Sequence, residues 1–239
     1  MASEHHSTGN QINVISAVDL SKTYLDGNRT VEALKSIDLE IRKGEKVALL
    51  GSSGSGKTTL LNLLAGLDRP DSGDLSLAGQ ELARLSPSQM ASYRRDRIGV
   101  VFQSFELISQ KTALQNVELP LIMAGTSRRA RRDQSTEALQ RVGLQDRIQH
   151  RPYQLSGGEK QRVAIARAMI CEPEILLADE PTGNLDLNSS KTVMELIVGL
   201  ADDSQTTLLL ITHDQQLAEK YADRILTMSD GQIVGDVTV

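Results

Sequence analysis

The chain has 239 residues, a net charge of −5, 39% hydrophobic and 24% charged residues, which is ordinary for a folded globular protein with its own core. The acidic balance and the 3% aromatic content argue against nucleic acid as a partner, because nucleic-acid binding needs basic surface and stacking platforms. The longest apolar runs fall far short of the ~20 residues that a membrane span needs. We therefore expect a soluble protein that reaches a membrane only through a partner.

The N-terminal residues and the single cysteine give two further expectations. Residues 1–11 are polar and lack the apolar stretch of a secretory signal, which predicts a disordered tail before one domain over residues 12–239. Cys171 is the only cysteine, so an internal disulfide is excluded. A reducing cytoplasmic setting fits this composition.

Residues 12–42 have the pattern of strands. Ile37, Leu39 and Ile41 alternate with polar residues, and the pair Asp26-Gly27 is a turn signal. We predict an antiparallel β unit here. Tyr24 lies in this unit, where its ring would either stack on an adenine or pack on core neighbours.

A glycine-rich loop follows the apolar run Val47–Leu50, which is typical of a buried strand. After the loop, four leucines with helical spacing predict a helix with one apolar face: Leu60, Leu63, Leu64 and Leu67. The loop has the pattern of nucleotide-phosphate loops, in which Gly, four residues, Gly, Lys and Ser or Thr follow a strand. Its residues are Gly51, Ser52, Ser53, Gly54, Ser55, Gly56, Lys57 and Thr58.

This pattern predicts a site for ATP and Mg²⁺. Glycines let backbone N–H groups close around phosphates, since a Cβ would hold the chain away or forbid the required φ. Lys57 supplies charge to the β- and γ-phosphates, the Thr58 hydroxyl is a Mg²⁺ ligand, and Thr59 lies beside them at the helix start. An ordinary Gly/Ser loop is the alternative, which the surrounding strand, Lys-Thr pair and helix disfavour.

Further along the chain, two strands are expected before the composition changes. Asp74 to Leu77 lies between turn clusters, and Ile98 to Gln103 reads as a buried strand. Gln103 at its end would reach Mg²⁺ or the attacking water, or would be a surface glutamine. Residues 104–165 are predicted to form an inserted helical subdomain. Its basic cluster of Arg128, Arg129, Arg131 and Arg132 is interpreted as a solvated helix face rather than a nucleic-acid patch, with anionic lipid contact as a lesser alternative.

A second phosphate-binding element is predicted at Leu155–Glu159. Ser156, Gly157 and Gly158 lie at the start of a predicted helix, where a hydroxyl, free backbone donors and the positive end of the helix dipole can bind an anion. The alternative for Ser156 is a plain helix N-cap.

Two buried strands are predicted to deliver the catalytic groups to one rim. The run Ile175–Ala178 leads to Asp179 and Glu180, and open α/β sheets bind ligands at such carboxyl ends. Because successive strand residues point to opposite sides, we expect Asp179 to support Mg²⁺ and Glu180 to polarise water. Alternatively, both are solvated carboxylates. His213 follows the apolar strand Leu208–Ile211 and would donate a hydrogen bond to the departing phosphate. The tail from Ile225, with its Asp230-Gly231 turn, predicts a hairpin.

With these motifs in order, the sequence resembles the nucleotide-binding subunit of ATP-binding-cassette (ABC) transporters over nearly the whole chain after residue 11. The resemblance implies an α/β phosphate-loop ATPase with an antiparallel β subdomain and an inserted helical subdomain. It also implies a head-to-tail homodimer, in which Ser156 and Gly158 of one subunit contact the γ-phosphate held by Lys57 of the other. Glu159 departs from the glutamine commonest in the family's signature. By the same resemblance, the site residues are the adenine-stacking Tyr24, the glutamine-loop Gln103, the catalytic base Glu180, the D-loop Asp186 and the switch His213.

Three stretches are most similar to the lipoprotein-releasing and macrolide-exporter group: Val101–Phe105, Asn116–Leu121 and Pro181–Asp186. The predicted partners are a second copy of the chain and integral membrane permease subunits, at the cytoplasmic face of the inner membrane. Two other classes stay open, a soluble ABC-type ATPase of DNA maintenance or translation and a phosphotransferase. The transported molecule is not encoded here, because its selectivity belongs to the membrane subunit.

Overall fold

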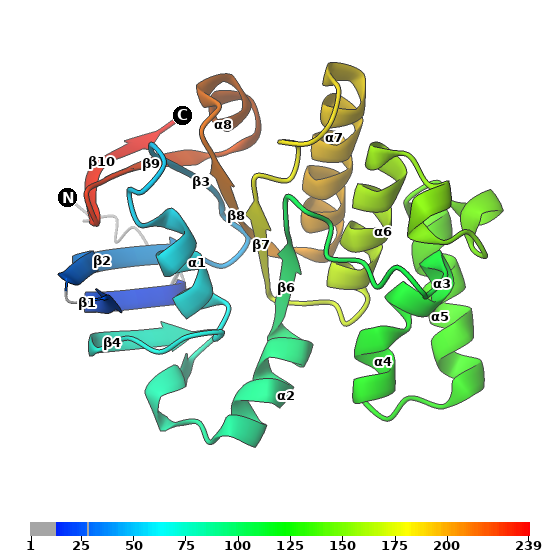
Figure 1. Cartoon of the computed structure of the whole chain (residues 1–239), viewed down its shortest axis with the longest axis horizontal. Helices are drawn as coiled ribbons and strands as arrows, with labels where there is room; N and C mark the ends of the chain where they lie inside the picture. The colour runs from blue at the N-terminus through cyan, green and yellow to red at the C-terminus, as the bar shows by residue number, and fades with distance from the viewer. Residues whose placement is uncertain (1–12, 28) are drawn as a thin grey trace, which may run out of the picture.

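The computed structural model describes residues 13–27 and 29–239, and the predicted tail over residues 1–11 lies outside the described residues. Two sheets organise the chain (Figure 1). One has four strands in the order β2-β1-β4-β5, and the other has six in the order β10-β9-β3-β8-β7-β6.

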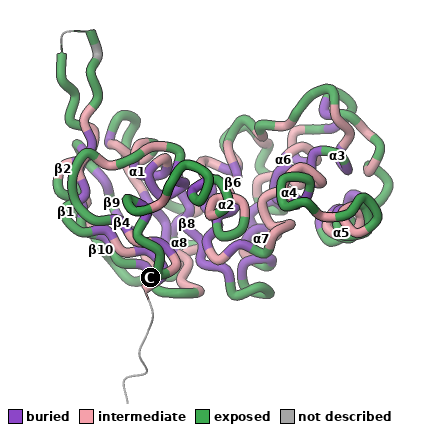
Figure 2. Tube along the Cα trace, turned by 90° about the horizontal axis from the view of Figure 1, so that it is seen from below, coloured by how far each residue is buried: buried purple, intermediate pink, exposed green. Residues whose placement is uncertain are grey.

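The smaller sheet is antiparallel, as the sequence predicts. β1 (Asn13–Asp26) pairs with β2 (Arg29–Arg42) on one side and with β4 (Ser72–Leu77) on the other. β5 (Gln80–Glu81) extends the edge beside β4. The Asp26-Gly27 turn signal therefore marks the hairpin between β1 and β2, whose outer end projects from the molecule (Figure 2).

The larger sheet is mainly parallel. β3 (Lys46–Leu50), β8 (Thr207–Thr212), β7 (Ile175–Asp179) and β6 (Ile98–Val101) run in the same direction, with β9 (Arg224–Ser229) parallel to β3. β10 (Gln232–Thr238) returns antiparallel to β9, which confirms the predicted C-terminal hairpin. β6 is shorter than expected and ends two residues before Gln103.

The parallel strands carry apolar residues almost without interruption because both faces are covered. Leu177 and Leu209 point into a core shared with the antiparallel sheet and α1, whereas Leu176, Leu208 and Leu210 point into a second core under α6 and α7. In Figure 2 the buried segments, drawn in purple, run through the middle of the molecule along the strands and the helices that pack on them. The alternation is the period of two that a strand requires.

Helices flank the sheets on both sides. α1 (Lys57–Leu64) follows the glycine-rich loop, α2 (Pro87–Arg97) precedes β6, and α7 (Leu187–Ser204) and α8 (Gln215–Tyr221) follow β7 and β8. Four further helices lie side by side in Figure 1: α3 (Ala113–Val117), α4 (Leu119–Met123), α5 (Arg128–Arg141) and α6 (Gly157–Met169). Short 3₁₀ helices cover Leu82–Arg84, Gln145–Arg147 and Pro152–Gln154. Within the described residues no helix has the length and apolarity of a membrane span.

Two helix predictions need correction. Leu67 is not on the apolar face of the first helix: α1 ends at Leu64, Gly66 follows with φ of 62°, and Leu67 is 55% exposed. A glycine in this left-handed conformation turns the chain away from the helix. α2 is not among the predicted helices, although Ser86 and Gln89 form a capping box at its start, a pattern that sequence alone can reveal.

The C-terminal hairpin carries a pH-dependent pair. Arg224 donates to both carboxylate oxygens of Asp236, at 2.7 and 2.6 Å, and these bonds hold the pKa of that carboxyl below its usual range. Since the folded-state pKa lies below the unfolded-state value of about 4, the ionised carboxylate stabilises the fold fully above about pH 4. This contribution is lost as the pH falls through the folded-state pKa.

We expect Asp236→Asn to lower the free energy of unfolding at pH 7 by about 0.5–1 kcal/mol, since the pair is partly exposed. The difference between variant and wild type in urea denaturation should shrink as the pH falls below about 4. Asp203→Asn, which loses only a contact at 3.9 Å to Arg141, is the control. An equal destabilisation by Asp236→Asn at every pH would contradict this assignment.

Candidate functional site

The glycine-rich loop connects β3 to α1 at the carboxyl edge of the parallel sheet. Gly56, which caps α1, has φ of 103°, and a Cβ there would lie 2.5 Å from the carbonyl oxygen of Ala33. A Cβ on Gly51 would lie 2.5 Å from the carbonyl oxygen of Met228. Neither position can take a side chain without movement of backbone, so the glycines are required for the loop to close.

Lys57 folds its side chain back over this loop. Its ammonium donates to the carbonyl oxygens of Gly51 at 2.6 Å and Ser52 at 2.8 Å. Ser55 is buried, and its hydroxyl oxygen has no hydrogen-bond partner in the part of the chain described. The loop thus holds a positive charge at its centre, beside the amino end of α1.

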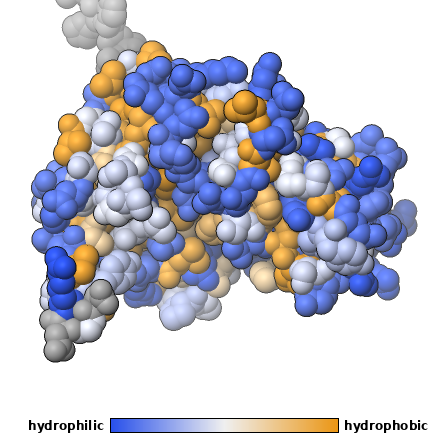
Figure 3. All heavy atoms as spheres, turned by 45° about the horizontal axis from the view of Figure 1, so that its top comes forward, coloured by the Kyte–Doolittle hydropathy of each residue, from blue (hydrophilic) through white to orange (hydrophobic). Residues whose placement is uncertain are grey.

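A cavity of about 690 Å³ lies against the loop and brings most predicted site residues together. They come from the ends of different elements, as expected for a parallel sheet whose carboxyl ends share one rim. Figure 3 shows one face of the molecule, on which hydrophilic surface surrounds separate hydrophobic patches. The lining contains Gly51, Ser53, Gly54, Gly56, Lys57, Thr58, Thr59, Gln103, Asp179, Glu180 and His213.

Asp179 and Glu180 occupy different environments. Burial raises the pKa of the Asp179 carboxyl, the neighbouring Glu180 adds to this, and Lys57 opposes it. A desolvated carboxylate of this kind is stabilised by a cation. Thr58 and Asp179 on one cavity are hard oxygen donors and therefore fit Mg²⁺.

Glu180 diverges from Asp179 for a reason other than the one predicted. β7 ends at Asp179, and Glu180 has φ of 44°, so a left-handed turn rather than strand alternation directs its side chain. Its carboxylate lies 2.8 Å from Nδ1 of His213 and accepts a bond from the Thr212 hydroxyl at 3.4 Å. The two groups predicted for catalysis are therefore directly bonded to each other.

Tyr24 is beside the cavity but is not part of its lining as described. Its hydroxyl donates to Asp68 at 2.8 Å, and the Lys22 ammonium lies 5.2 Å from the ring centroid. Lys22 itself is buried and also bonds Asp68 at 3.2 Å. The cross-strand partner of Tyr24 is Val31, which does line the cavity.

We expect Tyr24→Ala to raise the KM for ATP about three- to tenfold, with kcat little changed, because stacking contributes about 1 kcal/mol to ground-state binding. Tyr24→Phe keeps the ring and is the matched control. Asp68→Ala should raise KM as well, since it frees the Tyr24 hydroxyl and leaves Lys22 with only its bonds to Arg69 and Asp71 among the described residues. Steady-state phosphate release measures all three variants, and an unchanged KM in Tyr24→Ala would remove Tyr24 from the adenine site.

Ser156, Gly157 and Gly158 are not brought to this cavity within the described chain. Ser156 caps α6: its hydroxyl accepts from the backbone N–H of Glu159 at 3.2 Å, and the Glu159 carboxylate accepts from the Ser156 N–H at 2.8 Å. Glu159 also accepts from Arg147. The glutamate therefore makes a capping box that a glutamine would also make. Asp186 caps α7 by accepting the backbone N–H groups of Asn188 and Ser189.

Two parts of the cavity lining were not predicted as site residues. Val31, Glu32 and Ala33 on β2 and the turn residues Asp230 and Gly231 border the cavity. Gly231 donates its N–H to the carbonyl oxygen of Ser55 at 3.0 Å. The Asp230-Gly231 turn was recognised only as a hairpin, and β2 carries no motif that signals a ligand.

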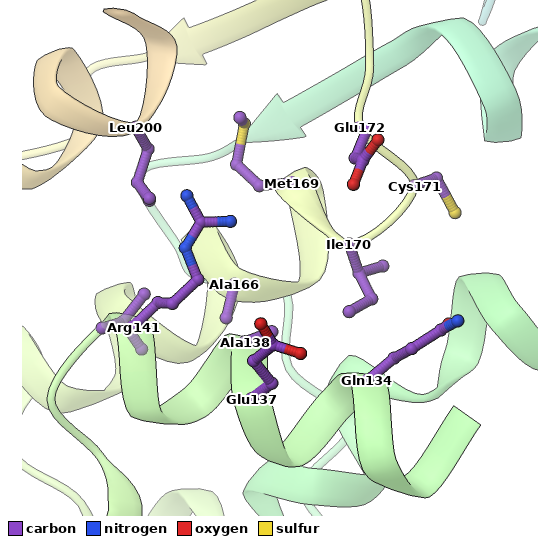
Figure 4. Close-up of a pocket in the computed structure, with 11 residues that line it drawn as sticks. Gln134, Glu137, Ala138, Arg141, Ala166, Met169, Ile170, Cys171, Glu172 and Leu200 are labelled. Carbon is purple, nitrogen blue, oxygen red and sulfur yellow. The ribbon is translucent and has the colours of Figure 1, made fainter. Parts of the chain in front are cut away.

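A separate cavity of about 330 Å³ lies between the ends of α5, α6 and α7 (Figure 4). Its lining includes Glu137, Arg141, Met169, Cys171 and Leu200, and none of the predicted site residues. Burial raises the pKa of the Cys171 thiol, which makes a reactive thiolate less accessible at neutral pH.

Known proteins are similar to this chain in sequence and in fold. The family model for ABC transporters matches residues 34–183. The macrolide export ATP-binding/permease protein MacB of Rhodopirellula baltica is 48% identical over 226 residues, which cover 94% of this chain and 33% of that protein. The lipoprotein-releasing system ATP-binding protein LolD of Chromohalobacter salexigens is 44% identical over 217 residues, covering 91% of each chain.

A solved dimeric structure of the ATP-binding cassette MJ0796, in a post-hydrolysis state with ADP and Pi, has a TM-score of 0.86. It is 39% identical and covers 94% of this chain and 98% of that chain. The chain thus spans about a third of its MacB relative and about nine-tenths of its LolD relative. With the family model, the relatives and the fold in agreement, the chain belongs to the ABC transporter family and is one of its ATP-binding domains.

Proposed function

We propose that this chain hydrolyses ATP to power a membrane transporter of the lipoprotein-release or macrolide-export type, as a head-to-tail homodimer bound to permease subunits. The proposal rests on the two separate places in which the structure puts the sequence motifs. Lys57, Glu180 and His213 share one cavity, whereas Ser156 caps a helix elsewhere. A site completed by a second copy accounts for both placements.

The residues of the cavity divide the work of hydrolysis. The loop amides and Lys57 bind the triphosphate. The Lys57 ammonium donates to the carbonyl oxygens of Gly51 and Ser52, which hold it over the loop. Glu180 orients and deprotonates the attacking water. His213 fixes the Glu180 carboxylate through their 2.8 Å contact and faces the departing phosphate.

The same cavity fits Mg²⁺. Thr58 and Asp179 would hold the ion, and Gln103 on the same lining would reach it or its water. When bound, Mg²⁺ supplies charge neutralisation between the β- and γ-phosphates. Asp179 is suited to this role because its carboxylate is already desolvated.

The second copy would contribute Ser156, Gly157 and Gly158. In the single chain the Ser156 hydroxyl accepts from Glu159, so the hydroxyl hydrogen is free to donate to a γ-phosphate oxygen. The N-terminus of α6 adds backbone N–H groups and the positive end of its dipole. ATP would then join the two chains, and hydrolysis would release them.

The transporter assignment rests on the relatives. The LolD relative is named for lipoprotein release, and the MacB relative carries a permease in the same protein. We place this chain at the cytoplasmic face of the inner membrane, and we assign about residues 104–165 to the inserted helical subdomain. These relatives do not favour the alternative of a soluble ATPase in DNA maintenance or translation.

Phosphate release tests the chemistry. The purified chain should convert Mg²⁺-ATP to ADP and free phosphate in equal amounts, and EDTA should stop the reaction. Transfer of phosphate to an acceptor, with no free phosphate, would instead indicate a phosphotransferase. Phosphate release at the same rate with excess EDTA would contradict the metal assignment.

A further inference from the structure

The loop Phe102–Glu106, which carries Gln103, is held by side chains rather than by regular secondary structure. It follows β6 directly, and Phe105 and Glu106 have φ of 63° and 48°. Residues other than glycine adopt this left-handed backbone only where their surroundings impose it. Phe105 and the next apolar residue, Leu107, are both half-buried, so neither offers the freely exposed surface that a loop would present alone.

Three side chains impose this backbone by donating to four main-chain carbonyls. Gln161 Nε2 donates to the carbonyl oxygen of Phe102 at 3.3 Å, and Asn184 Nδ2 donates to that of Gln103 at 3.0 Å. Arg167 donates through Nη2 to the carbonyl oxygen of Phe105 at 3.0 Å and through Nη1 to that of Glu106. We call Gln161, Arg167 and Asn184 the carbonyl clamp.

The orientation of two of the three donors, Gln161 and Arg167, is fixed by a second acceptor. Gln161 is fully buried, and its Nε2 also donates to the carbonyl oxygen of Pro181 at 2.7 Å. Because both neighbours are acceptors, the amide cannot be turned the other way. Arg167 uses two N–H groups of its planar fork, a geometry that lysine cannot reproduce.

The clamp joins the loop to both parts of the proposed site. Gln161 and Arg167 lie about 9 Å apart along α6, the helix that Ser156 caps. Asn184 belongs to the segment that follows Asp179 and Glu180. The Gln103 side chain rests on this segment, where a Cβ on Gly183 would lie 2.4 Å from Gln103 Nε2.

We propose that the carbonyl clamp is a set of positioning residues that holds the Gln103 loop, and with it the Gln103 side chain, in its place beside the proposed ATP site. The inference rests on the proposed function, because it gives Gln103 and Ser156 their roles in the ATP site. The clamp residues act through Gln103 and do not touch the nucleotide. All four of their bonds to the loop are made within the single chain.

Amide hydrogen exchange of the nucleotide-free chain tests the clamp apart from catalysis. Asn184→Ala and Arg167→Lys should speed exchange over residues 103–107 roughly five- to tenfold, as expected for one or two lost hydrogen bonds. Exchange in β3 and α1 should not change. Arg94→Lys is the matched control, because Arg94 is also half-buried and donates to one main-chain carbonyl, that of Gly66 at 2.8 Å. Exchange over residues 103–107 that stays within twofold of wild type in Asn184→Ala and Arg167→Lys would overturn the proposal.

A double-mutant cycle then tests whether the clamp acts through the Gln103 side chain. Asn184→Ala should raise the Mg²⁺ concentration for half-maximal ATPase activity, as Gln103→Ala does, and combining them should add nothing further. Independent, multiplying effects would show that Asn184 acts elsewhere and would overturn its positioning role. Absence of ATPase activity in the wild-type chain would instead defeat the proposed function, while the exchange experiment would still decide the clamp.

Discussion

Lys57→Ala should lower ATP affinity by at least about 100-fold while the protein stays folded. The ammonium bonds the carbonyls of Gly51 and Ser52 and stands at the centre of the loop. Its removal deletes a charge-assisted partner of the phosphates and leaves two carbonyl oxygens without their donor, facing an anion. Hydrogen bonds to charged groups are worth about 1.5–3 kcal/mol each, and about 2.7 kcal/mol corresponds to a 100-fold change in Kd.

Calorimetric titration with Mg²⁺-ATP measures the loss. Lys46→Ala is the matched control. Lys46 lies at the start of the same strand that leads into the loop, but its ammonium pairs with Asp202 at a distance of 2.9 Å, and neither residue lines the cavity. The control should bind ATP like wild type. Equal affinity in Lys57→Ala and wild type would remove Lys57 from the phosphate site.

Glu180→Gln should lower kcat about 10³-fold and keep ATP binding, because a general base contributes about 10²–10⁴ to the rate. The amide is nearly isosteric and can still bond His213 and Thr212, which lie 2.8 and 3.4 Å from the carboxylate. It cannot accept the proton of the attacking water. The loss therefore falls on the chemical step rather than on ground-state binding.

Single-turnover phosphate release and a separate binding titration distinguish these two quantities. Glu195→Gln, on the exposed side of α7 and paired with Lys191, is the control and should hydrolyse ATP at the wild-type rate. Unchanged turnover in Glu180→Gln would exclude Glu180 as the base, and loss of binding would show that it holds the nucleotide.

Much of this site could be predicted from the sequence because its motifs are short and local. The phosphate loop, the Asp179-Glu180 pair and His213 each follow an apolar strand, and parallel strands bring their carboxyl ends to one rim. The antiparallel unit and the final hairpin were readable from alternation and turn pairs. The family assignment from these motifs is confirmed by the family model and the relatives.

Other features depend on tertiary contacts that no local pattern records. The left-handed conformation that directs Glu180 is accompanied by a bond from its N–H to the carbonyl oxygen of Ile211 on the neighbouring strand. The Lys22 and Asp68 contacts around Tyr24 and the approach of Gly231 to the phosphate loop also join segments far apart in sequence. The prediction that Leu67 belongs to the first helix is wrong for a local reason, because α1 ends at Leu64 and Gly66 marks that end in the sequence. The roles of the single site residues remain predictions for the variants above.

Light scattering of Glu180→Gln with and without Mg²⁺-ATP tests the shared site most directly. Because turnover cannot dissolve the ATP-bound pair, the mass should rise from the 26.0 kDa of one chain to twice that value with ATP, and not with ADP. A second change, Ser156→Arg, should prevent the rise by blocking the contact across the pair. One unchanged mass with and without ATP, while ATP is bound, would contradict a site built from two copies.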